Sequence, residues 1–121
     1  MKRLILLLAP PLATALLPAT RAEAHAFLDH AVPAVGSTVA ATPRQVQLFF
    51  TQDLEPAFTG ATIANANGQP VAAGPAVFDP RNKAEMVLNL PPLAPGHYKV
   101  SWHALSVDTH RTEGSFAFDV Q

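Results

Sequence analysis

Apolar and polar residues alternate along most of this chain with a period of two rather than 3.6. Every second residue from Tyr98 to Ala104 is apolar, and the segments Val46 to Phe50 and Phe116 to Val120 alternate in the same way. A period of two places successive side chains on opposite faces of a strand, so these segments are predicted as half-buried β-strands. The chain is therefore expected to fold as an all-β protein.

Weaker alternation predicts further strands, separated by turn signals. The weaker candidates are His25 to Ala31, Thr59 to Ala64, Val71 to Phe78 and Glu85 to Leu90. The turn signals are Pro33-Ala34-Val35-Gly36, Asn65-Ala66-Asn67-Gly68, Asp79-Pro80-Arg81-Asn82 and Ala94-Pro95-Gly96. About seven short strands in about 100 residues are typical of an immunoglobulin-like Greek-key β-sandwich. A small β-barrel would give much the same pattern, and periodicity alone does not separate the two.

The first 24 residues have the features of a secretory signal peptide. Lys2 and Arg3 form a positive start, an apolar stretch runs from Leu4 to Leu17, and Ala22-Glu23-Ala24 has the small-x-small pattern of a cleavage site. The apolar stretch is shorter than the roughly 20 residues of a spanning helix, which argues against a membrane anchor. We therefore expect residues 1–24 to be a cleaved leader and residues 25–121 to form one soluble domain.

Cleavage would leave a small, mildly acidic protein. Removing 24 of the 121 residues leaves 97, enough for a single core. The leader holds three of the eight Lys and Arg residues and one of the nine Asp and Glu residues, so the net charge becomes −3. Nucleic acid is not expected as a partner, because phosphate binding needs a concentrated basic patch. The chain has no cysteine, which excludes disulfides and thiolate metal sites.

Cleavage after Ala24 would also create a metal chelate. His25 would then carry a free α-amine, and the amine and Nδ1 can close a six-membered ring around one ion. Asp108 and His110 are two residues apart, so in an extended segment they would point to the same side and offer an oxygen and a nitrogen. Nitrogen and oxygen donors in a square-planar or tetragonal arrangement favour Cu(II), leave Ni(II) as an alternative and suit Zn(II) less well. Taken alone, Asp108 and His110 would be read as an ordinary turn aspartate and a surface histidine.

Several segments together resemble the CopC family of periplasmic copper resistance proteins. They are His25-Ala26-Phe27-Leu28, Pro33-Ala34-Val35-Gly36-Ser37, Leu48-Phe49-Phe50-Thr51, the stretch from Pro95 to His110, and Gly114-Ser115-Phe116-Ala117-Phe118. The most specific part, Tyr98 to His110, is similar to the family's "Y-x-V-x-W-x-x-x-S-x-D-x-H" stretch. The resemblance covers essentially the whole chain after residue 24.

The resemblance implies a fold, a site and a function. The fold is a seven-stranded cupredoxin-like or immunoglobulin-like sandwich, and the Cu(II) ligands fall on His25, Asp108 and His110. The expected function is periplasmic copper homeostasis or resistance, by sequestering copper or passing it to an inner-membrane transporter of the CopD type or another periplasmic copper protein. A monomer is the default expectation. Whether Asp108 or water fills the fourth copper position is left open.

One departure from the family concerns copper(I). Some members carry a second, methionine-rich Cu(I) site between their middle strands, whereas residues 65–76 of this chain contain no methionine. Cu(I) selection relies on soft sulfur ligands. The one methionine after residue 24 is Met86, which is expected in the core, so a single Cu(II) site and no Cu(I) site are expected.

Two other functions would fit parts of the sequence. An amino-terminal histidine chelate also occurs in copper monooxygenases, but a carboxylate from Asp108 would occupy the open position that such catalysis needs, so the chain is not expected to be an enzyme. A metal-free immunoglobulin-like interaction module is compatible with the fold. The remaining histidines, His30, His97 and His103, are expected at the surface, and Trp102 is expected as the central core aromatic.

Overall fold

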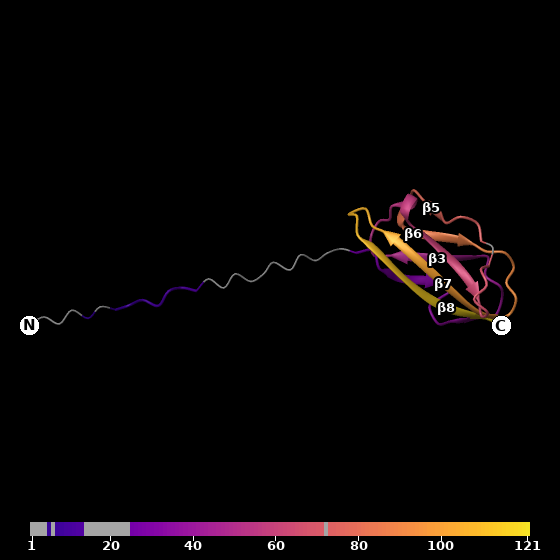
Figure 1. Cartoon of the computed structure of the whole chain (residues 1–121), viewed down its shortest axis with the longest axis horizontal. Coiled ribbons are helices and arrows are strands. Elements are labelled where there is room, and N and C mark those ends of the chain that lie inside the picture. Colours follow the sequence, from indigo (N-terminus) through magenta and orange to yellow (C-terminus); the bar gives the residue numbers. More distant parts are fainter. Residues whose placement is uncertain (1–4, 6, 14–24, 72) are drawn as a thin grey trace, which may run out of the picture.

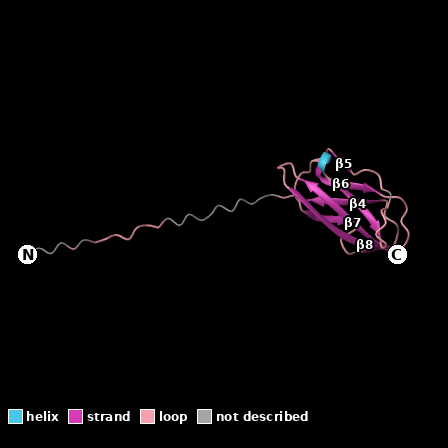
Figure 2. Ribbon diagram, viewed as in Figure 1, coloured by secondary structure: helices cyan, strands magenta, loops and turns pink. Residues whose placement is uncertain are grey.

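The computed structural model describes residues 5, 7–13, 25–71 and 73–121. The predicted cleavage site at 22–24 and most of the predicted leader lie outside the described residues. The strands are β1 (Leu28–Val32), β2 (Thr38–Val39), β3 (Gln45–Phe50), β4 (Gly60–Asn65), β5 (Val77–Asp79), β6 (Asn82–Asn89), β7 (Gly96–Leu105) and β8 (Arg111–Val120). A short 3₁₀ turn, η1 (Pro56–Phe58), is the one helical element among the described residues (Figure 2).

The strands form two four-stranded sheets packed as a sandwich (Figure 1). One sheet has the order β1-β3-β6-β5 and the other has the order β2-β8-β7-β4. All neighbours are antiparallel except β2 and β8, which run parallel. The predicted all-β sandwich is confirmed. The described strands number eight rather than seven, because β2 has only two residues and is too short for alternation to reveal it.

The core lies between the sheets and follows the alternation read from the sequence. On β7, Tyr98, Val100, Trp102 and Ala104 are all buried, and the ring of Phe50 on β3 meets Trp102 edge-on at 5.1 Å between centroids. Each large apolar side chain buried in this way contributes about 1.5–3 kcal/mol. Met86 is also fully buried, as predicted.

The hairpin of β7 and β8 carries the candidate site at its tip. The two strands pair without interruption from Gly96 opposite Val120 to Leu105 opposite Arg111. Gly114 lies opposite Trp102, and a Cβ there would come within 2.7 Å of the indole Cζ2 atom. The absence of a side chain at Gly114 therefore makes room for the central aromatic of the core.

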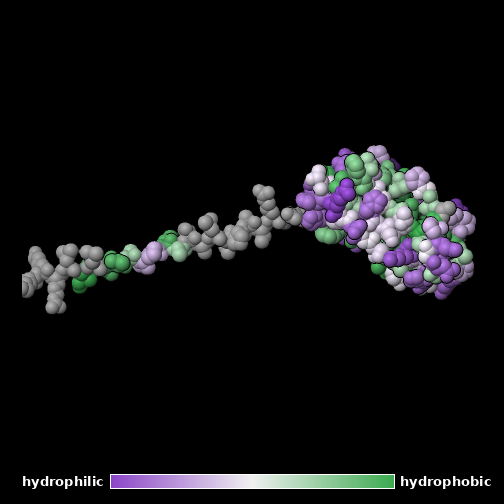
Figure 3. Space-filling model, viewed as in Figure 1, coloured by the Kyte–Doolittle hydropathy of each residue, from purple (hydrophilic) through white to green (hydrophobic). Residues whose placement is uncertain are grey.

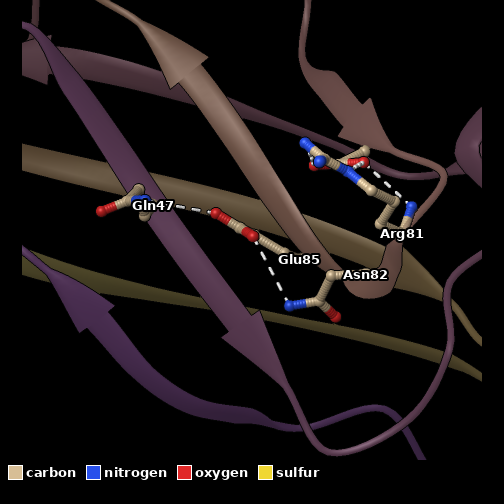
Figure 4. Close-up of polar contacts among 5 residues, drawn as sticks. Gln47, Arg81, Asn82 and Glu85 are labelled. Carbon is tan, nitrogen blue, oxygen red and sulfur yellow. Dashed lines mark hydrogen bonds and ion pairs between the residues drawn. The ribbon is translucent and has the colours of Figure 1, made fainter.

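The outer face of the β3–β6 sheet is polar. The Gln47 side-chain amide donates to Glu85 Oε1 at 3.3 Å, and the Asn82 amide donates to Glu85 Oε2 at 3.5 Å (Figure 4). At the β5–β6 turn, the Arg81 side chain donates to Asp79 and lowers the pKa of that carboxyl below its usual value. Hydrophilic and hydrophobic residues are interspersed over the face of the domain seen in Figure 3.

The chain enters the domain at the end where the β7–β8 loop turns. In Figure 1 the violet segment that begins at residue 25 lies near the yellow-orange β7–β8 loop, and the C-terminus lies at the opposite end. Among the described residues, every buried residue lies between Ala26 and Val120, whereas Ile5, Leu7 and Leu12 in the predicted leader are 83%, 91% and 92% exposed. These three side chains therefore take no part in the core. No helix within the described ranges is long and apolar enough to cross a membrane.

Candidate metal centre

Residues 106–110 form a tight loop at the tip of the β7–β8 hairpin. The Ser106 N–H donates to the His110 carbonyl at 3.0 Å, and the Thr109 N–H donates to the Ser106 carbonyl at 2.9 Å. Thr109 has φ +73°, a left-handed conformation that is unusual for a β-branched residue. The loop therefore holds a strained residue between the two predicted ligands Asp108 and His110.

Asp108 is held by contacts from both sides of the loop. The buried Ser106 hydroxyl donates to Asp108 Oδ1, and Asp108 Oδ2 lies 3.3 Å from His110 Nδ1. The Ser106 hydrogen bond lowers the pKa of Asp108 below its usual value, burial opposes this, and His110 lowers the pKa further. The carboxylate is therefore kept in the ionised form that binds a cation.

His25 comes to this loop from the segment just before β1. Its ring centroid lies 4.6 Å from that of His110, with the two rings at 72°, and 5.7 Å from that of Phe27. The Nδ1 atoms of His25 and His110 are both shielded from solvent. The two imidazole rings thus meet edge to face at the end of the sandwich where the chain enters.

Two threonine hydroxyl groups form hydrogen bonds with the backbone of His25 and of the two residues that follow it. The Thr51 hydroxyl donates to the His25 carbonyl and accepts from the Phe27 N–H, both at 3.0 Å. The Thr112 hydroxyl donates to the carbonyl of the fully buried Ala26 at 2.5 Å. Neither threonine was identified as a site residue from the sequence, because contacts between such distant segments leave no local pattern.

The structure therefore brings together the three predicted ligands as neighbours. His25 contacts His110, and His110 contacts Asp108. Within the part of the chain that the structure describes, however, no three His, Asp or Glu side chains are arranged to hold a metal ion together. The expected amine donor of His25 is a peptide nitrogen in the full-length chain, because Ala24 precedes His25.

Asp108 and His110 lie together because the chain turns between them, not because the segment is extended as expected. An extended segment was expected to place them on one side, but residues 107–109 turn and β8 begins only at Arg111. The turn itself, closed by the Ser106 contacts, brings the two side chains together.

The other histidines lie at the surface, as predicted. His30 is paired with Asp29 and stacks on Phe49 at 4.3 Å, and His97 is paired with Asp119. His103 is exposed on the outer face of β7.

Comparison with known proteins now places the fold and the loop in a family. Residues 28–121 match the CopC domain. The chain belongs to the CopC family. The matched range includes Asp108 and His110, and it starts three residues after His25.

Copper resistance proteins from several bacteria match this CopC-family chain over most of their lengths. It is 36% identical over 115 residues to "Copper resistance protein C" from Pseudomonas syringae pv. tomato, covering 90% of each chain. The crystal structure of CopC from Methylosinus trichosporium OB3b superposes with a TM-score of 0.76 at 37% identity, covering 80% of this chain and 94% of that one. PcoC from Escherichia coli superposes with a TM-score of 0.73 at 34% identity, covering 81% and 100%.

PcoC is described as a methionine-rich copper resistance protein, and in this respect the chain differs from it. Of the two methionines in this CopC-family sequence, Met1 begins the chain and Met86 is fully buried in the core. A buried thioether packed among apolar side chains acts as a core residue rather than an accessible ligand.

Proposed function

We propose that this CopC-family protein is a periplasmic copper-binding protein that holds one Cu(II) ion at the end of the sandwich where the chain enters. Cleavage after Ala24 supplies the amine of His25, and His25 Nδ1, His110 and Asp108 complete the donor set. The observation that carries the proposal is the 4.6 Å approach of the His25 and His110 rings beside the Asp108 carboxylate.

The chemistry of the donors supports Cu(II) over other ions. Three nitrogens and one oxygen suit the tetragonal geometry of Cu(II), and soft sulfur ligands for Cu(I) are absent from the loop at 65–76. A carboxylate that is already ionised offsets part of the positive charge of the ion.

The proposed function is binding and transfer rather than catalysis. Asp108 would fill the position that a copper oxidase leaves open for oxygen. The ion would be sequestered or passed to a copper transporter of the CopD type in the inner membrane or to another periplasmic copper protein, and the protein would act as a monomer.

A Cu(II) titration followed by electron paramagnetic resonance tests the proposal. The chain beginning at His25 should bind one equivalent and show coupling of the copper to nitrogen. A spectrum without nitrogen coupling would contradict the copper site. Rapid ascorbate oxidation with turnover would instead favour the oxidase, and no binding at all would favour a metal-free interaction module.

A further inference from the structure

The segment 25–27, which carries the first proposed ligand, is anchored to both sheets of the sandwich. Thr51 directly follows β3 in one sheet, and Thr112 lies in β8 of the other. The regular ladder of β1 begins only at Leu28, so these contacts hold residues 25–27 ahead of that strand.

Thr51 makes three hydrogen bonds to this segment. Its N–H donates to the Phe27 carbonyl at 2.9 Å, and its hydroxyl bridges the Phe27 N–H and the His25 carbonyl. The hydroxyl thus continues the β1–β3 pairing beyond the last residue pair of the ladder, Leu28 opposite Phe50.

Thr112 holds the same segment from the opposite side. Its hydroxyl donates to Ala26, whose side chain is fully buried, and it lies two residues after His110 in the chain. Thr112, near the start of β8, thus fixes the neighbour of His25, and His110 lies in the loop just before that strand.

We propose that Thr51 and Thr112 are positioning residues of the copper site, whose hydroxyls clamp the backbone of residues 25–27 so that His25 faces His110. The clamp rests on the proposed function, since its purpose is to pre-arrange a ligand. Pre-arranged donors bind more tightly because less conformational freedom is lost on binding. The clamp also holds the Phe27 N–H in a hydrogen bond, which keeps that nitrogen out of the copper coordination sphere.

Valine and serine substitutions separate the hydroxyl from the bulk of each threonine. In the chain beginning at His25, Thr51→Val and Thr112→Val should each weaken Cu(II) binding by roughly 3- to 10-fold, the range expected for one or two hydrogen bonds. Thr51→Ser and Thr112→Ser keep the hydroxyl and should restore most of the affinity. Thr62→Val, at an exposed position on β4, is the matched control and should bind as the unsubstituted protein does.

The copper spectrum distinguishes positioning from a general effect on folding. The valine variants should show an altered nitrogen coupling pattern at full copper loading, whereas Thr62→Val should not. Unchanged affinity and spectrum in both valine variants would overturn the clamp, and so would serine variants that lose as much affinity as the valine variants.

Metal-free protein separates failure of the clamp from failure of the proposed function. If the unsubstituted chain binds no Cu(II), the proposed function fails, and nuclear Overhauser contacts between the rings of His25 and His110 decide the clamp. Contacts that persist in the serine variants and disappear in the valine variants support it. Contacts that survive in both valine variants overturn it.

Discussion

The imidazole ring of His25 lies 4.6 Å from that of His110, although the two residues stand at opposite ends of the folded domain's sequence. The contact joins the segment before β1 to the loop between β7 and β8, where Asp108 Oδ2 lies 3.3 Å from His110 Nδ1. The fold thus gathers the proposed copper ligands from the segment before β1 and from the last hairpin.

Replacing a proposed ligand should cost more affinity than replacing any other histidine. His110→Ala removes a nitrogen donor, so Cu(II) affinity in competition titrations should fall by more than the roughly 10- to 100-fold typical of losing an outer-sphere partner. His103→Ala is the control, because that side chain lies on the outer face of β7 away from His25. Equal losses in the two variants would remove His110 from the ligand set.

Ser106→Ala should raise the pKa of Asp108 toward its usual value, because the Ser106 hydrogen bond is the largest cause of its lowering. A carboxyl whose pKa is lowered by folding adds stability above the pKa of the unfolded chain and loses it as pH falls through the folded value. Ser106→Ala should therefore lose less stability on acidification than the unsubstituted protein. Titration of the Asp108 carboxyl carbon by NMR measures the shift, and an unchanged midpoint would show that Ser106 does not set it.

Thr109→Gly should relieve the left-handed strain in the loop. Holding a non-glycine residue in that region costs about 1–3 kcal/mol of folding free energy. Replacing it with glycine removes this strain, but glycine also has more conformational freedom in the unfolded chain, which offsets part of the gain. The free energy of unfolding in urea should rise by up to about 1 kcal/mol. A fall in that free energy would mean that the Thr109 side chain stabilises the loop by more than its backbone strains it.

Gly114→Ala should destabilise the core. The added Cβ would lie 2.7 Å from the Trp102 ring, so the indole or β8 must move, at a cost of about 1–3 kcal/mol. Gly74→Ala is the matched control, since a Cβ there meets no atom within 4 Å. Thermal unfolding should show a lower midpoint for Gly114→Ala alone, and similar midpoints for both variants would contradict the close approach.

Much of the fold could be predicted from alternation, and the failures have physical causes. The stretch Tyr98 to Ala104 falls within β7, because a strand buried on one face shows a full period-two pattern. β8 begins at Arg111 rather than Phe116, because Gly114 interrupts the alternation to make room for Trp102. The strand predicted from Val71 to Phe78 began too early, because among its described residues only Val77 and Phe78 lie in strand β5.

The site was predicted less completely than the fold. The residue types of His25, Asp108 and His110 pointed to a metal, but the sequence could not reveal that a turn rather than an extended segment joins Asp108 to His110. Thr51 and Thr112 had no local signal at all, because their partners His25 and Ala26 come from a distant segment.

The most direct test of the central claim compares two chains that differ by one residue. A chain beginning at His25 has a free amine beside its imidazole, whereas a chain with one glycine ahead of His25 has an amide in its place. Adding the glycine should lower Cu(II) affinity by at least roughly 100-fold, or about 2.7 kcal/mol, and remove one nitrogen coupling from the resonance spectrum. Equal affinity and identical spectra for the two chains would contradict a copper site that uses the amine of His25.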